Sequence, residues 1–153
     1  MRTLYTLLLV AVLIAATAGK LSRDVGADTL KNGYYTAEAA EYAYGWKEFL
    51  TIFVSDGKIV TAEYDARNAS GFIKSWDMDY MRRMNETDHN YPNRYTRAYV
   101  SDLLDRQGVE GIDAMSGATE SFESFKLLAA AAIANASAGD KQVAFVYIPP
   151  FEK

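Results

Sequence analysis

The residues best suited to chemistry lie in one short run, Asp113 to Thr119, which reads Asp-Ala-Met-Ser-Gly-Ala-Thr. Its last residue, Thr119, is a hydroxyl nucleophile that follows two small residues, Gly117 and Ala118. A helical pattern begins directly after it, and the N-terminus of a helix attracts anions through its free N–H groups and its dipole. Gly117 lets the backbone approach a bulky ligand closely. The run therefore predicts a hydroxyl placed beside a phosphate-binding helix end.

Other interpretations of the same residues remain open. Ser-Gly-Ala-Thr is also typical of a turn followed by a helix N-cap, with Asp113 starting the turn and capping nearby N–H groups. A hydrolase could use Ser116 or Thr119, but it would need a base, and the chain has one histidine, His89, in a polar stretch. The glycine that a nucleophile elbow places before its serine is missing. A metal site is conceivable from Asp77, Asp79, Asp88 and His89. Acidic residues at exposed helix ends are the usual explanation for such a group.

Strands and helices on either side of this run must position it. Apolar, β-branched and aromatic residues predict strands over residues 33–43, 46–54 and 59–64, and Ser55-Asp56-Gly57-Lys58 predicts a hairpin between the last two. Helical spacing predicts helices over residues 75–86, 95–107 and 120–138, with a break at residues 89–93 around Pro92. A final strand is predicted over residues 142–148. The sum is an α+β domain, with three helices packed on a small antiparallel sheet and residues 109–118 as a loop at a helix N-terminus.

Composition narrows the possible chemistry. The chain has 153 residues, which suits one domain, and a formal charge of −4. It contains no cysteine, which excludes disulfides, zinc–thiolate sites, iron–sulfur clusters and c-type haem attachment. No basic patch is interleaved with aromatic residues, so nucleic acid is not an expected partner. Redox chemistry would therefore require an organic cofactor or a metal site without thiolates.

The N-terminus has the pattern of an export signal. Arg2 precedes a continuous apolar stretch, and Ala16-Thr17-Ala18 supplies small residues at the spacing of a signal-peptidase site. We expect a signal peptide at residues 1–18, a linker at 19–32 and a domain at 33–153. An uncleaved signal anchor is the second possibility, and a buried core helix is the third. A lipid anchor would require a cysteine after the apolar stretch, and none follows it. The expected location is the bacterial periplasm or the outer face of the cytoplasmic membrane.

Residues 113–119 match the pattern Asp-(Gly/Ala)-x-(Ser/Thr)-Gly-Ala-(Ser/Thr), and the chain thereby resembles the FMN-binding domain family. That family includes flavin-carrying components of the sodium-translocating NADH:quinone reductase and of the Rnf complex. Residues 33–66 also look like the opening strands of its small modules, so the resemblance extends from Asn32 to about Asn135. In the family, a flavin transferase moves FMN from FAD onto the last Ser or Thr of the motif and forms a phosphoester. The resemblance implies covalent FMN on Thr119.

An FMN attached there would need three kinds of support. Its phosphate needs donors, which the N–H groups after Thr119 and the hydroxyl of Ser116 can provide. The small residues Gly117 and Ala118 complete the motif, and Asp113 would serve the loop or the transferase. The ring needs flat apolar partners, for which we expect Met115 first and Trp46 second. Further candidates for the ring are Tyr64, Trp76 and Tyr80. Packing in the core or on the sheet is the alternative for each of them.

The resemblance implies an extracytoplasmic electron carrier more than a stand-alone enzyme. Such a protein would pass electrons within a membrane-associated redox chain. Its implied partners are a flavin transferase and redox proteins at the membrane. The alternative is a binding or surface module outside the cytoplasm that keeps the fold but carries no flavin.

Overall fold

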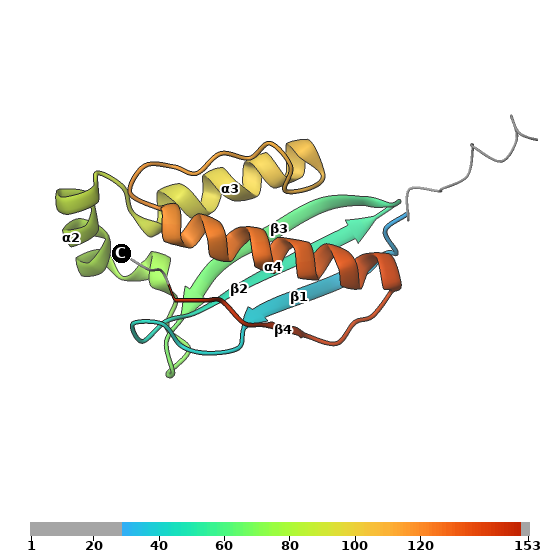
Figure 1. Ribbon diagram of the computed structural model, residues 1–153, viewed down its shortest axis with the longest axis horizontal. Helices are drawn as coiled ribbons and strands as arrows, with labels where there is room; N and C mark the ends of the chain where they lie inside the picture. The colour runs from blue at the N-terminus through green and yellow to red at the C-terminus, as the bar shows by residue number, and fades with distance from the viewer. Residues whose placement is uncertain (1–28, 151–153) are drawn as a thin grey trace, which may run out of the picture.

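The computed structural model describes residues 29–150, which form one α+β domain. The predicted signal peptide at residues 1–18 lies outside the described residues. In chain order the elements are β1 (Gly33–Ala39), β2 (Lys47–Ser55), β3 (Lys58–Arg67), the 3₁₀ helix η1 (Lys74–Trp76), α2 (Met78–Asp88), α3 (Pro92–Arg106), α4 (Thr119–Ala138) and β4 (Ala144–Val146). The predicted fold class is confirmed, and Figure 1 shows the helices against the sheet.

The sheet has the strand order β3-β2-β1-β4. β2 and β3 form the predicted hairpin, in which Asp56 (φ 52°) and Gly57 (φ 73°) both adopt the left-handed conformation. Two left-handed residues in a two-residue turn match the right-handed twist of the flanking strands. β1 lies antiparallel to β2. α3 and α4 pack against this three-stranded meander.

The sheet is mixed, and the predicted fully antiparallel arrangement is wrong at β4. β4 pairs in parallel with β1, with Ala37 opposite Ala144. The reason is the path of α4. The backbone N–H of Lys31 donates to the carbonyl of Ala136 (3.0 Å), so β1 starts beside the C-terminal end of α4. Because the chain also leaves α4 at this end and enters β4, both strands start from the same side and run in one direction.

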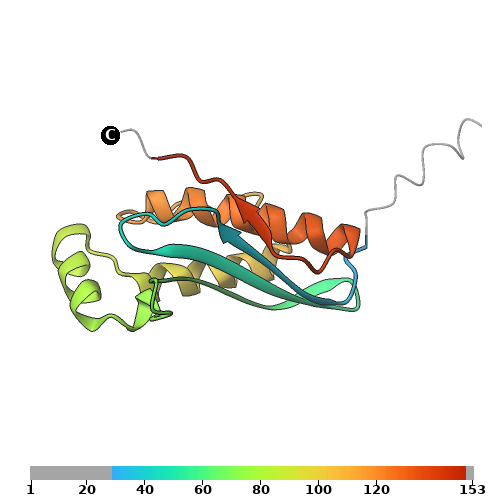
Figure 2. The same ribbon diagram turned by 90° about the horizontal axis from the view of Figure 1, so that it is seen from below.

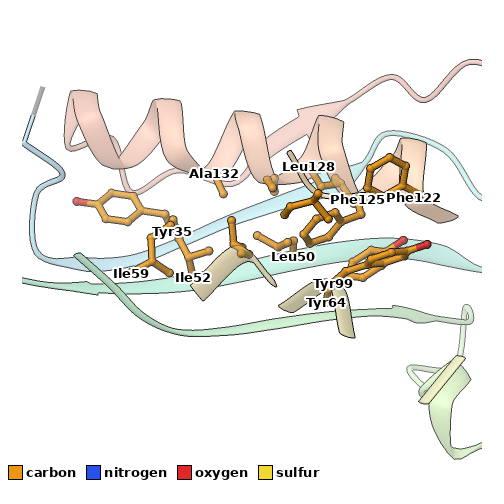
Figure 3. Close-up of a cluster of buried hydrophobic side chains, with 14 of the residues drawn as sticks. Tyr35, Leu50, Ile52, Ile59, Tyr64, Tyr99, Phe122, Phe125, Leu128 and Ala132 are labelled. Atoms are coloured by element: carbon orange, nitrogen blue, oxygen red, sulfur yellow. The ribbon is translucent and has the colours of Figure 1, made fainter. Parts of the chain in front are cut away.

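α4 and α3 cover one face of the sheet and enclose the core. Figure 3 shows side chains of α4 facing those of the strands, and Figure 2 shows the same layers from another side. The ring of Phe125 is fully buried, with its centroid 5.3 Å from that of Tyr99 and 5.2 Å from that of Tyr64. The labelled residues of this core are Tyr35, Leu50, Ile52, Ile59, Tyr64, Tyr99, Phe122, Phe125, Leu128 and Ala132.

Several predicted boundaries are wrong in instructive ways. The predicted break at residues 89–93 is limited to residues 89–91, because Pro92 already occupies the first position of α3, where its missing N–H costs nothing. The first strand ends at Ala39, the third continues to Arg67, and the last is limited to Ala144–Val146. α2 lies beside the end of the sheet and buries no residue (Figure 1). Within residues 29–150, no helix combines the length and the apolar character that a membrane span requires.

Candidate functional site

α4 begins at Thr119 and has no side-chain cap. The N-cap residue is Ala118, whose side chain cannot accept a hydrogen bond. The first backbone bond of the helix runs from the N–H of Phe122 to the carbonyl of Ala118 (3.0 Å). The N–H groups that precede Phe122 belong to the first turn, which lacks intrahelical partners. Thr119 itself is exposed, so this 20-residue helix presents a hydroxyl beside an uncapped N-terminus. The free N–H groups and the dipole of such a helix end favour negative charge.

The loop in front of Thr119 is held by one buried tyrosine. The hydroxyl of Tyr99 donates to the carbonyl of Ala118 (3.2 Å) and accepts from the N–H of Met115 (3.0 Å). Asn90 adds a third bond, from its side-chain amide to the carbonyl of Ser116 (2.8 Å). α3 and the segment before it thereby fix the position of the motif loop relative to the core.

Gly117 is required by both its conformation and its surroundings. Its φ of +75° lies in the left-handed region, where residues with a Cβ are strained. A Cβ at this position would overlap the carbonyl oxygen of Asp88 and lie 3.0 Å from the Cβ of Asp88. The motif loop and the end of α2 therefore approach each other closely only because residue 117 is glycine.

A large cavity opens next to Thr119. Its volume is about 980 Å³, at the upper end of the range found for small-molecule and cofactor sites. Its walls come from the end of β1, the β1–β2 loop, the start of β2, η1, α2, α3, the first two turns of α4 and the segment after β4. Gly117, Ala118 and Thr119 all line it. The predicted attachment residue is therefore exposed and lies on the wall of the cavity.

Aromatic and thioether side chains provide flat apolar surface in this cavity. Trp46 and Tyr80 line it with ring centroids 6.1 Å apart in an edge-to-face arrangement. Met84 lies on the same helix as Tyr80 and also faces the cavity. Although α2 is amphipathic in sequence, it buries none of its residues. Its residues Tyr80 and Met84 are thus available to a ligand in the cavity.

Glu48 and Lys74 are two of the five charged side chains on the cavity wall. Burial raises the pKa of Glu48 above its ordinary value of 4.5, although hydrogen bonding from Ser124 and the charge of Lys74 oppose this effect. The hydroxyl of Tyr64 lies 3.2 Å from Oε1 of Glu48 and donates to the carbonyl of Ser121 (2.7 Å). The carboxyl group of Glu48 is therefore a half-buried acid in contact with the first turns of α4.

The raised pKa of Glu48 has a measurable consequence for stability. The pKa of Glu48 is higher in the folded than in the unfolded protein, so the protonated carboxyl makes its full contribution to stability below pH 4.5, the unfolded pKa. This contribution is lost as the pH rises through the folded pKa. Glu48→Gln does not titrate and keeps an acceptor for Tyr64. We expect its free energy of unfolding to fall less than that of the unaltered protein between pH 4 and pH 7. Urea denaturation of both proteins across this range measures the difference, and parallel pH profiles would refute the assignment.

The structure brings some of the predicted site residues together and separates others. Gly117, Ala118, Thr119 and Trp46 line the cavity. Ser116 and Asp113 are exposed in the loop before it and are not among the lining residues. Met115 packs against the core and likewise does not line the cavity.

Among the other ring candidates, only Tyr80 lines the cavity, whereas Tyr64 is buried in the core and Trp76 is largely exposed. Sequence reasoning missed Glu48 and Lys74. They lie far from the motif along the chain, and no local pattern marks them.

Three of the residues considered for a metal site, Asp77, Asp79 and His89, have structural roles. Asp77 caps α2 by accepting a hydrogen bond from the N–H of Tyr80 (2.9 Å). Asp79 pairs with Arg82 at 3.2 Å, and His89 ends α2 in the left-handed conformation. Within the part of the chain that the structure describes, no three acidic, histidine or cysteine side chains form a group able to hold a metal ion.

Comparison with known proteins adds relatives but no ligand. No protein-family model matches the chain. The 15 kDa lipoprotein of Treponema pallidum (strain Nichols) is 34 % identical over 115 residues, which are 74 % of this chain and 82 % of that protein.

Two solved structures are also similar. A crystal structure of the CPE2226 protein from Clostridium perfringens is 35 % identical and covers 78 % of this chain and 99 % of that one, with a TM-score of 0.75. A solution NMR structure of a Clostridium thermocellum protein is 27 % identical and covers 70 % of this chain and 92 % of that one, with a TM-score of 0.49. The clostridial crystal structure therefore shares the fold described above.

Proposed function

This chain belongs to the family of the 15 kDa lipoprotein of Treponema pallidum, and we propose, from the geometry around Thr119, that it is an extracytoplasmic electron carrier with FMN bound covalently to that residue. A lipoprotein in the family supports a location outside the cytoplasm and in association with a membrane. The present chain has no cysteine to carry a lipid, so an uncleaved N-terminal anchor or a membrane-bound partner would hold it there.

The observation that carries the proposal is the position of Thr119. Its exposed hydroxyl stands at the uncapped N-terminus of α4 and on the wall of the cavity. A phosphoryl group esterified to that hydroxyl would retain negative charge next to the free N–H groups and the positive end of the helix dipole. An alanine N-cap typically costs about 1 kcal/mol relative to Ser, Thr, Asn or Asp. A phosphate at this position would compensate for the missing cap.

The remaining walls of the cavity fit a flavin ring. Trp46, Tyr80 and Met84 would hold its faces by apolar contact, as aromatic and thioether groups commonly do. When bound, FMN supplies reversible electron transfer. Attachment through the phosphate would keep the cofactor on the protein outside the cytoplasm, where a lost flavin is not readily recaptured. The ring would remain free of covalent bonds.

The site would face away from an N-terminal tether. α4 has 20 residues, and at 1.5 Å per residue it is about 30 Å long. Thr119 is the first residue of α4, whereas the backbone N–H of Lys31 donates to the carbonyl of Ala136 near the end of the helix. The start of β1 lies beside that C-terminal end of α4 (Figure 1). A tether that precedes residue 29 would therefore hold the opposite end of the domain from the cavity. We infer that the flavin would be presented to redox partner proteins that reach the distal end.

Expression together with a flavin transferase tests the proposal directly. The purified protein should be yellow, and its flavin fluorescence should remain with the polypeptide after denaturation in a gel. Protein expressed without the transferase serves as the control and should be colourless. If the protein stays colourless with an active transferase, the proposal fails and a binding module without flavin replaces it.

A further inference from the structure

Lys74 differs in the sign of its charge from the other charged residues that line the cavity. The charged side chains on the cavity wall are Lys74 and four acids: Glu41, Glu48, Asp88 and Glu120. Among the described residues that line the cavity, Lys74 is thus the only cation. Any negative charge that develops on a ligand there would meet acidic neighbours on several sides and one compensating ammonium group.

The backbone of Lys74 is anchored to the sheet. η1 follows a bridge between Arg67 and Ile73, which joins this segment to the end of β3. The next residue, Ser75, is buried, and its N–H donates to Oδ1 of Asp65 (3.3 Å), a buried carboxylate of β3. The lysine therefore projects from a fixed point of the fold rather than from a free surface loop.

The ammonium end of the Lys74 side chain is also held in place. Nζ of Lys74 lies 5.1 Å from the ring centroid of Tyr80, within the range of a cation–π contact. Burial opposes the charge, but Tyr95, Tyr80 and Glu48 outweigh burial, and together they raise the pKa of Lys74 above 10.5. The side chain accordingly stays protonated at neutral pH, although it is half-buried.

We propose that Lys74 holds a fixed positive charge beside the flavin ring and stabilises the reduced cofactor, an inference that rests on the proposed attachment of FMN to Thr119. Two electrons from a redox partner protein and one proton from solvent give the reduced ring one more negative charge than the oxidised ring. A neighbouring cation lowers the free energy of the reduced form, and the effect is larger in a half-buried cavity than in water. Lys74 would thus raise the reduction potential against the influence of the four acids.

The reduction potential of flavin-loaded protein tests this inference. The unaltered protein, Lys74→Met and Lys74→Gln would be expressed with the flavin transferase and titrated with dithionite at pH 7 against reference dyes. We expect either neutral variant to reduce the ratio of reduced to oxidised flavin about tenfold at a given potential, a shift of about 30 mV to lower potential for a two-electron couple. Lys74→Gln retains a polar side chain and serves as the second neutral variant if Lys74→Met folds poorly.

Two controls separate the local charge from general effects. Lys74→Arg keeps the charge and should restore most of the potential. Lys58→Met removes the same charge from an exposed position in the β2–β3 hairpin, at the end of the sheet remote from the cavity, and should leave the potential unchanged. Intact mass would report the flavin content of each variant, and thermal unfolding would report its fold.

The possible outcomes distinguish the two proposals. If flavin is attached and both neutral variants have the same potential as the unaltered protein, the role of Lys74 is overturned while the attachment of FMN stands. A shift of the neutral variants to higher potential would also overturn the role of Lys74. If the unaltered protein carries no flavin, both proposals fail.

Discussion

Gly117→Ala should lower the free energy of unfolding by about 3 kcal/mol. Residue 117 has a φ of +75°, and a left-handed conformation costs a residue with a Cβ about 1–2 kcal/mol. The new methyl group would also overlap the carbonyl oxygen of Asp88, and overpacking of this kind typically costs about 1–3 kcal/mol. Urea denaturation measures the sum. Because the clash would push the motif loop away from the end of α2, we also expect less flavin to be attached to this variant.

Gly71→Ala is the matched control for the contact with Asp88. Gly71 has a φ of +85°, but a Cβ there would have no neighbour within 4 Å. The control therefore carries the conformational cost without the overlap, and we expect a loss of about 1–2 kcal/mol. Equal losses in the two variants would show that the approach of the motif loop to α2 contributes nothing to stability.

Tyr99→Phe should cost about 2 kcal/mol although it removes a single oxygen atom. The hydroxyl bonds both the carbonyl of Ala118 and the N–H of Met115. The substitution leaves the N–H of Met115 without this partner, whereas the carbonyl of Ala118 keeps its bond from the N–H of Phe122. A buried polar group that loses its partner costs about 1–3 kcal/mol. Since these bonds hold the loop in front of Thr119, the variant should also acquire flavin more slowly. Denaturation and the time course of flavin attachment measure the two effects.

Tyr35→Phe is the matched control for this prediction. Tyr35 is equally buried, but its hydroxyl has no hydrogen-bond partner among the residues that the structure describes. Removal of an unpaired buried hydroxyl should leave stability unchanged or raise it slightly. If Tyr99→Phe is as stable as Tyr35→Phe, the hydroxyl of Tyr99 does not hold the motif loop.

Local patterns predicted the elements that surround the motif. The turn residues Asp56 and Gly57 indicated the hairpin, because few other pairs tolerate two left-handed conformations. The apolar spacing after Thr119 indicated a helix, and the buried residues Phe122, Phe125 and Leu128 follow that spacing. Both features depend on short-range geometry, which a sequence displays directly.

Features that depend on distant contacts could not be predicted in the same way. The parallel pairing of β4 follows from the position of Lys31 beside the end of α4, which no local pattern reveals. The placement of Glu48 and Lys74 is similar, since both line the cavity only when β2 and η1 are brought to one end of the sheet. The position of Met115 also depends on a contact with a distant residue. Its place in the motif suggested a ring contact, but the bond to Tyr99 turns this part of the loop toward the core.

The intact mass of the protein tests the central claim most directly. After expression with a flavin transferase, the unaltered chain should gain the mass of FMN minus water. Thr119→Ser keeps a hydroxyl at the start of α4 and should gain the same mass, whereas Thr119→Ala should gain none. An unmodified mass for the unaltered chain, or a flavin adduct on Thr119→Ala, would contradict attachment at Thr119.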